Sequence, residues 1–356
     1  MAENHQFYKP KIDSETAKQV VFELYGLKVV KISELDGYDD KNFHVIVDED
    51  ICDNKSIGKV LKGGYVFKVV NSLESQNEKL FEAQTELMLF LNKHNIKCPG
   101  PIETKNHKSF DTVLLPSGKH IARLLEFIPG DVLFKLPNPK ADIFYQVGLL
   151  TAELDKVLQD FKHPAYYKHP QWCLGASPDI LHYLNAVEEK HQALVKTVIA
   201  EFSSRVLTIE NSFSKGLIHG DVNEQNLIIS TTNNSPVVEA IIDFGDTHHC
   251  CYLYELALAM TYMIFLANNI DVGGYVLGGY ASIKEVKLED IKLLKICVMA
   301  RLCQSLVLGA NSSLQDPSNE YVLTTARTGW GLLKHLYSQP EDDVVGRWKK
   351  ISEKKL

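Results

Sequence analysis

The sequence predicts an α+β fold with two lobes, an N-terminal antiparallel sheet carrying one key helix and a mainly helical C-terminal lobe. Residues up to about 127 read as alternating apolar strands interrupted by one amphipathic segment, 78–93. The chain then breaks at Ile128-Pro129-Gly130, and beyond it long segments with helical spacing dominate. We therefore expect the lobes to comprise residues 1–128 and 129–356.

The N-terminal lobe is expected to begin with a helix. Ser14 is placed to cap this helix, which runs to Leu24 and is ended by Gly26. Strands are then predicted at 42–47, 64–70, 112–115 and 120–127, with the helix 78–93 between the second and third.

The C-terminal lobe is expected to open with a long helix, 141–161. Three short strands interrupt the helices at 217–219, 227–229 and 237–244, the last two joined in part by an Asn-Asn-Ser-Pro turn. The apolar stretch Leu256 to Ala267 is shorter than the roughly 18 residues that a membrane span needs, and we expect a buried helix.

Composition restricts the possible partners. The chain of 356 residues is 45% hydrophobic and carries a formal net charge of −7, which disfavours nucleic acid and favours a cationic substrate. Seven cysteines without a CxxC pair are typical of a reducing compartment. With no export signal recognised, we expect a cytoplasmic protein without membrane contact, and the sequence does not indicate an oligomeric state.

Two short motifs carry the chemistry. Asp221 lies in His219-Gly220-Asp221, Asn226 follows five residues later, and Asp243-Phe244-Gly245-Asp246 begins 17 residues after Asn226. Phosphoryl transfer to a hydroxyl needs a carboxylate near the attacking oxygen and hard oxygen ligands for Mg²⁺. Either motif alone is typical of a turn or a strand end. Together, in this order and each beside an apolar strand, they predict Asp221 as base and Asn226 and Asp243 as metal ligands.

Lys68 is the candidate for the nucleotide phosphates. It lies in the strand 64–70, on the opposite side from its most apolar residues, and a lysine there is costly unless its charge is used. A glutamate of the following helix would pair with it, and we prefer Glu82 to Glu86. The alternative is an exposed lysine on an edge strand.

The rest of the nucleotide site is less clearly marked, because the chain has neither a GxGxxG nor a Walker A sequence. Gly37 and Asn42, in the loop where phosphates would be cradled, are candidate nucleotide contacts or hairpin-shaping residues. The backbone of Glu126, Phe127 and Ile128 is expected to read the edge of the base, adenine or guanine.

Three other polar residues are candidate substrate contacts. Asp246 follows the metal motif, and Glu255 begins an apolar helix, where it either supports the helix N-terminus or faces a substrate amine. Arg301 shares a helix face with Gln304 and binds either a substrate carboxylate or a structural acid, with the structural ion pair preferred.

The run His248-His249-Cys250-Cys251 suggests a metal site at first sight. Adjacent residues splay apart, however, and the run lacks the spacing of zinc ligands. We expect it to be structural.

The motifs HGDxxxxN and IDFGD, with a preceding lysine strand, resemble the aminoglycoside phosphotransferase family of protein-kinase-like enzymes. The resemblance covers residues 38 to 330 and is closest to the branch that phosphorylates hydroxylysine, in YDDKNFHV, RLLEFIPG, HGDVNEQN, IDFGD, ARLCQSLV and TARTGW. It implies a two-lobed kinase-like fold with a nucleotide-binding lobe, 1–128, and a catalytic and substrate-binding lobe, 129–356.

The resemblance also implies an activity. GTP, with ATP as the alternative donor, would phosphorylate 5-hydroxy-L-lysine to 5-phosphooxy-L-lysine and GDP in the cytoplasm, a step in hydroxylysine breakdown. Asp221 would accept the proton, Asn226 and Asp243 would bind Mg²⁺, and Lys68 with Glu82 would hold the nucleotide. The alternatives are a kinase of another small amino alcohol or hydroxy amino acid, such as homoserine, choline or ethanolamine, and a catalytically silent nucleotide-binding scaffold.

Overall fold

The computed structural model describes residues 9–37, 39–232, 235–315 and 326–354. The chain divides into two compact units, Met1–Pro129 and Gly130–Leu356. The division follows Pro129, one residue beyond the predicted lobe end. Asn233 and Asn234 of the predicted turn, and the first residues of two quoted motifs (Tyr38 and Thr325), lie outside the described residues.

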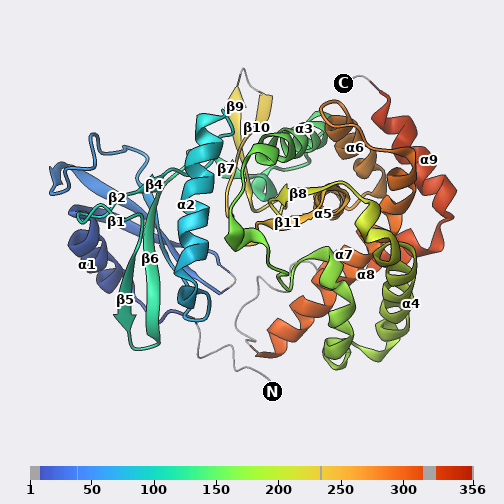
Figure 1. Cartoon of the computed structure of the whole chain (residues 1–356), viewed down its shortest axis with the longest axis horizontal. Helices are drawn as coiled ribbons and strands as arrows, with labels where there is room; N and C mark the ends of the chain where they lie inside the picture. Colours follow the sequence, from blue (N-terminus) through green and yellow to red (C-terminus); the bar gives the residue numbers. More distant parts are fainter. Residues whose placement is uncertain (1–8, 38, 233–234, 316–325, 355–356) are drawn as a thin grey trace. The chain divides into compact units, whose positions relative to one another are not determined.

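The N-terminal unit is an antiparallel sheet in the order β1-β2-β3-β6-β4, with β5 also paired to β6, and two α-helices (Figure 1). Its elements are α1 Ser14–Tyr25, β1 Leu27–Leu35, β2 Lys41–Cys52, β3 Tyr65–Val69, η2 Glu74–Gln76, α2 Glu78–Lys93, β4 Pro101–Ile102, β5 Asp111–Leu115 and β6 Gly118–Glu126. The predicted strands and both helices are present. The sequence missed β1, whose mostly exposed or half-buried residues give no clean apolar alternation.

The ends of α1 show how local chemistry sets a helix. The cap is Asp13 and not Ser14, because the Asp13 carboxylate accepts a hydrogen bond from Thr16 N at 2.8 Å. Gly26 ends the helix as predicted, with φ of +66°.

Side chains on β3 alternate as the sequence predicts. Tyr65, Phe67 and Val69 are fully buried in the core that α1 covers, which leaves Lys68 half-buried on the other face. The helix α2 is tied to β6 by Gln84 Oε1, which accepts from Arg123 Nη1 at 2.7 Å.

The C-terminal unit is mainly helical, with two small sheets ordered β10-β9-β7 and β11-β8. Its strands are β7 Asp131–Val132, β8 Lys215–Ile218, β9 Leu227–Thr232, β10 Ser235–Ile241 and β11 His248–Cys251. Its α-helices are α3 Ala141–Val157, α4 Glu189–Arg205, α5 Tyr252–Ala267, α6 Gly273–Ala281, α7 Leu288–Gln315, α8 Ala326–Ser338 and α9 Glu341–Ser352. Short 3₁₀ segments are η3 Leu133–Lys135, η4 Leu158–Asp160, η5 Pro164–Tyr166, η6 Leu174–Ala186, η7 Leu207–Ser212 and η8 Ile270–Val272. The predicted α+β fold class is confirmed.

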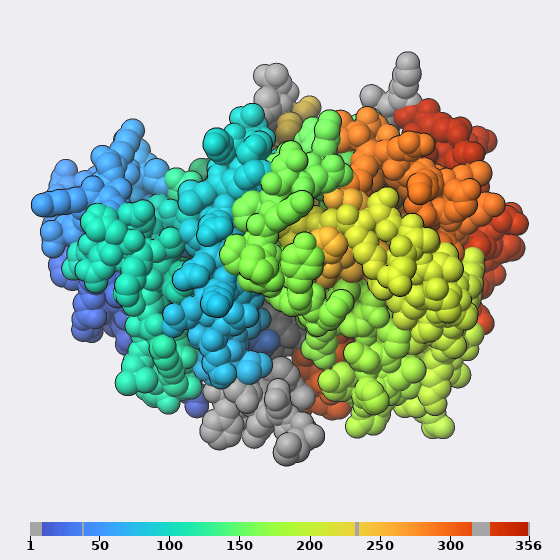
Figure 2. All heavy atoms as spheres, viewed as in Figure 1, coloured from blue at the N-terminus to red at the C-terminus, as the bar shows by residue number. Residues whose placement is uncertain are grey.

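Close helix packing surrounds the small sheets. A Cβ added to Gly148 of α3 would lie 1.9 Å from Val276 O of α6, and one added to Gly279 of α6 would lie 1.9 Å from Tyr145 O of α3. The missing side chains therefore let these two helices touch through their backbones. On the other side of α6, α9 packs beside it at the surface, orange against red in Figure 2.

Two apolar helices form the centre of this unit. As predicted, α5 is buried, from Tyr252 to Phe265. Among the described helices, α7 passes a length and composition test for a membrane span over Leu288–Leu314, but 89% of its apolar window is buried within the protein. That burial is typical of a core helix.

Candidate active site

The ends of three strands, β8, β9 and β10, bring the two predicted motifs together. The strand β8 stops just before His219, and β9 starts just after Asn226. The strand β10 pairs with β9 and stops before Ile242, whose N–H donates to Asn226 O at 2.9 Å. Asn226 therefore lies beside the segment that carries Asp243.

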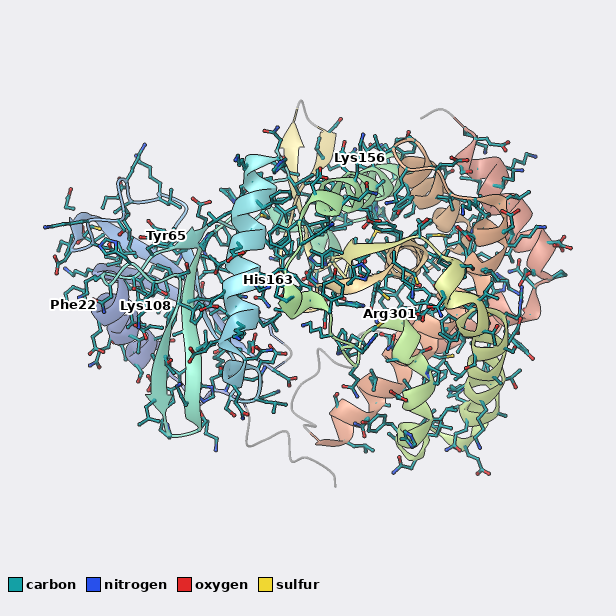
Figure 3. The ribbon with its side chains drawn as sticks, in the orientation of Figure 1. Phe22, Tyr65, Lys108, Lys156, His163 and Arg301 are labelled. Carbon is teal, nitrogen blue, oxygen red and sulfur yellow. The ribbon has the colours of Figure 1, made fainter. Side chains whose placement is uncertain are left out.

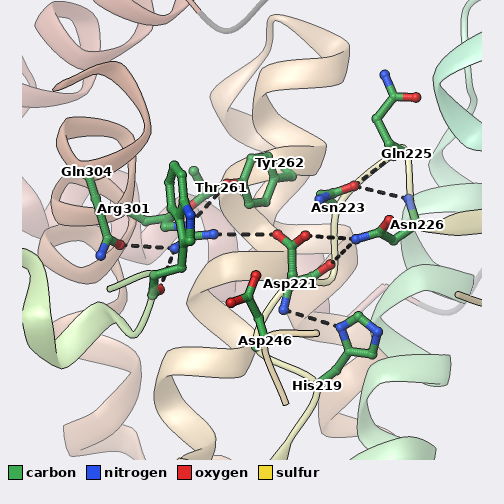
Figure 4. A network of polar contacts seen from close by, with 12 residues as sticks. His219, Asp221, Asn223, Gln225, Asn226, Asp246, Thr261, Tyr262, Arg301 and Gln304 are labelled. Carbon is green, nitrogen blue, oxygen red and sulfur yellow. Dashed lines mark hydrogen bonds and ion pairs between the residues drawn. The ribbon is translucent and has the colours of Figure 1, made fainter. Parts of the chain in front are cut away.

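Asp221 is held from two sides (Figure 4). Asn226 Nδ2 donates to its Oδ2 at 2.8 Å and to its backbone O at 3.0 Å. On the other side, Arg301 Nη2 lies 3.5 Å from its Oδ1. The Asp221 side chain remains 25% exposed, so a hydroxyl group can approach the carboxylate. Partial burial raises the pKa of Asp221, and the positive charge of Arg301 opposes that shift.

Arg301 is buried inside the helical unit, with 1% of its surface exposed (Figure 3). Its Nη1 donates to Trp172 O at 2.7 Å and to Gln304 Oε1 at 3.0 Å, and its Nε donates to Tyr262 Oη at 3.2 Å. These donors are directed to protein acceptors, as the structural-acid alternative predicts, and the acid is Asp221. A substrate carboxylate would have to displace an existing partner.

Glu255 binds the backbone of the His219-Gly220-Asp221 motif through its carboxylate. Its Oε1 accepts from His219 N at 2.7 Å and its Oε2 from Gly220 N at 3.0 Å, and the side chain is fully buried. Gly220 has φ of +81°, and a Cβ there would lie 2.5 Å from Asp246 O. The sequence did not suggest this role for Glu255, which lies away from solvent and so away from a substrate amine.

His219 joins the two motifs. Its Nδ1 accepts from Asp221 N at 3.2 Å, and its Nε2 lies 3.1 Å from Ile242 O. Burial lowers the pKa of His219 to about 4, so the ring is neutral and donates through Nε2. A neutral ring adds no positive charge beside Asp221.

Asn223 shapes the loop between Asp221 and Asn226. Its Oδ1 accepts from Gln225 N at 2.8 Å and from Asn226 N at 3.0 Å. This is an Asx turn, a feature that is not among the predictions although the Asn at position 223 favours it.

Oxygen atoms at the site fit a divalent cation. Asp243 is exposed and has φ of +63°, and Asn226 uses its Nδ2 on Asp221, which leaves its Oδ1 as the ligand atom. Carboxylate and amide oxygens are ligands that Mg²⁺ prefers. Nearby, burial and the negative charge of Asp221 raise the pKa of Asp246 to about 7. A neighbouring cation would stabilise the charged form of Asp246.

In the N-terminal unit, the carboxylate beside Lys68 belongs to Asp40. Lys68 Nζ lies 3.0 Å from Asp40 Oδ2, whereas Glu82 is exposed on α2. Asp40 is fixed in turn, because its Oδ1 accepts from Asn71 N at 2.8 Å and from Asn71 Nδ2 at 3.1 Å. Asp40 is not among the predicted residues, because the prediction places the partner of Lys68 on the following helix.

The remaining nucleotide candidates have local roles. A Cβ on Gly37 would lie 2.8 Å from Asp40 O, and Asn42 Nδ2 donates to Asp36 O at 3.4 Å, as expected of hairpin-shaping residues.

Two of the three residues expected to bind the base already use their backbone N–H groups within the protein. Glu126 N donates to Gly100 O at 2.8 Å and Phe127 N to Gly64 O at 3.3 Å. These two N–H groups are therefore already used within the unit, and Ile128, the third predicted residue, is buried.

Residues 36–285 match the Phosphotransferase enzyme family. The chain belongs to this family. Hydroxylysine kinase of Xenopus laevis is 32% identical to this chain, over 96% of the chain and 94% of that protein. Such coverage includes both units.

Solved structures show the same fold at low identity. A microcompartment-associated aminopropanol kinase matches with a TM-score of 0.70 and 18% identity, over 92% of this chain and 98% of that one. Amicoumacin kinase, in complex with AMP-PNP, Ca²⁺ and Ami, matches with a TM-score of 0.67 and 14% identity, over 93% of this chain and 97% of that one. This member of the phosphotransferase enzyme family is therefore a kinase-like phosphotransferase.

Proposed function

We propose that this phosphotransferase transfers the γ-phosphoryl group of GTP to the hydroxyl of 5-hydroxy-L-lysine, giving 5-phosphooxy-L-lysine and GDP in the cytoplasm. The observation that carries the reaction type is the partly exposed Asp221 carboxylate held between Asn226 and Arg301. Support for the acceptor comes from the Xenopus laevis relative, which is named for hydroxylysine and aligns over nearly its whole length.

In this mechanism Asp221 orients the acceptor hydroxyl and takes its proton as the bond to phosphorus forms. The contacts of Asp221 with Asn226 and Arg301 restrict the position of its carboxylate. This restriction matters because a base must lie within hydrogen-bond distance of the proton that it removes. Asn226 and Asp243 would hold Mg²⁺, which neutralises charge on the β- and γ-phosphates. Asp246, with its partial exposure and nearby acidic groups, suits an ammonium group of the acceptor.

Lys68 is proposed to bind the nucleotide phosphates through its ammonium group. Its ammonium lies beside Asp40 at 3.0 Å, so a phosphate oxygen would share or replace that carboxylate as its partner. Glu82 would support Lys68 only after a rearrangement of one of the two side chains.

The test measures initial rates of nucleoside diphosphate release from the purified full chain with Mg²⁺. Release should depend on 5-hydroxy-L-lysine and be absent with L-lysine, which lacks only the hydroxyl, and GTP should exceed ATP in kcat/KM. Homoserine, choline and ethanolamine serve as competing acceptors. Faster release with one of these would replace hydroxylysine as the acceptor, and no release with any of them would overturn the proposal.

A further inference from the structure

A buried cluster of sulfur and nitrogen atoms lies in the C-terminal unit, next to the segment that carries Asp246. It consists of Cys173, His248 and Cys250, whose ligand atoms all lie within 4.8 Å of one another. The three residues are 4%, 2% and 7% exposed. The proposed phosphoryl transfer uses none of them.

The fold assembles this cluster from distant parts of the chain. His248 and Cys250 are two residues apart on β11 and so project to the same side. His249 projects the other way and stacks on Tyr167 at 4.9 Å, as the argument from splayed neighbours predicted. The third ligand comes from Cys173, 77 positions before Cys250 and just before η6, and no local pattern in the sequence predicts this proximity.

His248 presents an unshared electron pair to the protein interior. Its Nδ1 lies 2.6 Å from Asp246 O, and a carbonyl oxygen only accepts, so Nδ1 carries the proton. Its Nε2 is then an acceptor, and it is buried without a hydrogen-bond partner in the described part of the chain. A histidine whose second nitrogen donates to a carbonyl is the usual form of a metal ligand. An unsatisfied buried acceptor is costly, and a metal ion removes that cost.

The sulfur atoms have a suitable separation. Cys173 Sγ and Cys250 Sγ are 3.5 Å apart, and both residues are free thiols. Two sulfurs bound to one tetrahedral zinc ion at 2.3 Å are about 3.8 Å apart. A disulfide, by contrast, requires about 2.0 Å.

We propose that Cys173, His248 and Cys250 form a structural zinc site. Thiolate and imidazole ligands suit Zn²⁺ and distinguish this site from the oxygen ligands offered to Mg²⁺. Glu210 is the candidate for the fourth position, because its carboxylate groups with Cys250 and Cys251. A Cβ on Gly175 would lie 3.1 Å from Glu210 Oε1 and 3.6 Å from Cys173 Sγ, so this carboxylate borders the site.

The position of the site gives it a supporting role. Cys173 O accepts from Gln304 Nε2 at 3.0 Å, and the adjacent Trp172 O accepts from Arg301, the partner of Asp221. Zinc would therefore link two parts of the chain. One is the segment at Trp172 and Cys173, which orients Arg301, and the other is β11, which follows Asp246.

The experiment uses the full chain, reduced and stripped of metal with a chelator. Zn²⁺ titrated against a chromophoric competitor should bind at one ion per chain and raise Tm. Co²⁺ in its place should give the near-ultraviolet charge-transfer band of thiolate ligands, which a metal ion at Asn226 and Asp243 cannot produce. The X-ray absorption spectrum of the zinc-loaded wild type should show two sulfur neighbours.

Variants assign the ligands. Cys173→Ser and Cys250→Ser should each weaken Zn²⁺ binding by at least about 100-fold and reduce the Co²⁺ band. Cys98→Ser and Cys297→Ser are matched controls, because both residues are buried cysteines outside the cluster and should leave binding unchanged. Circular dichroism checks that each variant is folded.

The wild-type spectra decide the matter even if a ligand variant fails to fold. A zinc spectrum with only oxygen and nitrogen neighbours, or a Co²⁺ complex without a thiolate band, would overturn the proposal. So would a chain that binds no Zn²⁺ but forms a Cys173–Cys250 disulfide under mild oxidation, because the two thiols would then be a redox pair.

Discussion

The loop that carries Asp221 and the strand that carries Lys68 are fixed in different ways. Behind Asp221, fully buried Glu255 holds the loop backbone and nearly fully buried Arg301 holds the carboxylate, and both come from distant helices. Lys68 is paired with Asp40 from the neighbouring hairpin, and Asp40 is fixed by Asn71, close to Lys68 in the chain.

This difference matches the two tasks that we propose. A base must lie within hydrogen-bond distance of the proton that it removes, and a displacement of about 1 Å is already costly, whereas a cation that neutralises phosphate acts over a longer range. Buried polar groups fix the position of the Asp221 carboxylate. Leaving any of these groups unpaired is costly in free energy. In the proposed reaction, Lys68 needs to change partners when the nucleotide binds.

The largest effect should come from Asp221→Asn. Loss of the base should lower kcat by about 10²- to 10⁴-fold, with the nucleotide Kd little changed. Diphosphate release and nucleotide titration measure the two quantities. Because buried Arg301 loses its anionic partner, Tm should also fall, and rates are compared at a temperature where both proteins are folded. Near-normal turnover would remove Asp221 from the mechanism.

Lys68→Ala tests the other side of the comparison. It should cost about 2 to 5 kcal/mol of transition-state stabilisation, seen as a lower kcat/KM for the nucleotide. Asp40→Asn should have a smaller effect, because the phosphates replace Asp40 as the partner of Lys68. Lys119→Ala, at an exposed lysine of β6, is the control. Equal losses in the Lys68 and Lys119 variants would contradict a specific role for Lys68.

Glu255→Gln tests whether the loop backbone needs both carboxylate oxygens. The amide group offers one acceptor, so His219 N or Gly220 N is left unpaired at a cost of about 1 to 3 kcal/mol. We expect Tm to fall and kcat to fall by about 5- to 100-fold, with KM little changed. Glu189→Gln is the matched control, since Glu189 is also in the first turn of a helix but is exposed. A variant with unchanged kcat would show that Glu255 does not position the loop.

The last prediction is for stability and not for activity, and it concerns Asp155, a buried acid of α3 that accepts from Tyr280 Oη at 2.5 Å. Burial raises the pKa of Asp155 well above its ordinary value, so the native state binds a proton that the unfolded state releases. The contribution of Asp155 to stability is therefore present below the ordinary Asp pKa and is lost as pH rises toward the folded value.

Asp155→Asn removes that pH dependence and keeps an acceptor for Tyr280. The stability of the variant relative to wild type should rise with pH, by up to about 1.4 kcal/mol for each pH unit in this range. Urea unfolding at pH 5 to 8 measures it, with Asp160→Asn at an exposed acid as control. A difference that does not change with pH would contradict the raised pKa.

The sequence by itself determined the fold class and most of the strands, and it predicted the two motifs that we propose to be catalytic. These features depend on local patterns: alternation along a strand, helical spacing, and motifs that each span only a few residues. Asn226 and Asp243 come together because adjacent strands of one hairpin end side by side, which a local pattern can predict.

Only the tertiary structure decided which buried side chains contact the residues of the two motifs. Arg301 pairs with Asp221 and Glu255 holds the backbone of Gly220 because α5 packs against β8 and β11, and α7 packs against α5. Cys173 reaches Cys250 across 77 positions for the same reason. Pairs this distant depend on how whole helices pack, and a buried polar side chain looks the same in sequence whether its partner is a substrate, a metal ion or the protein itself.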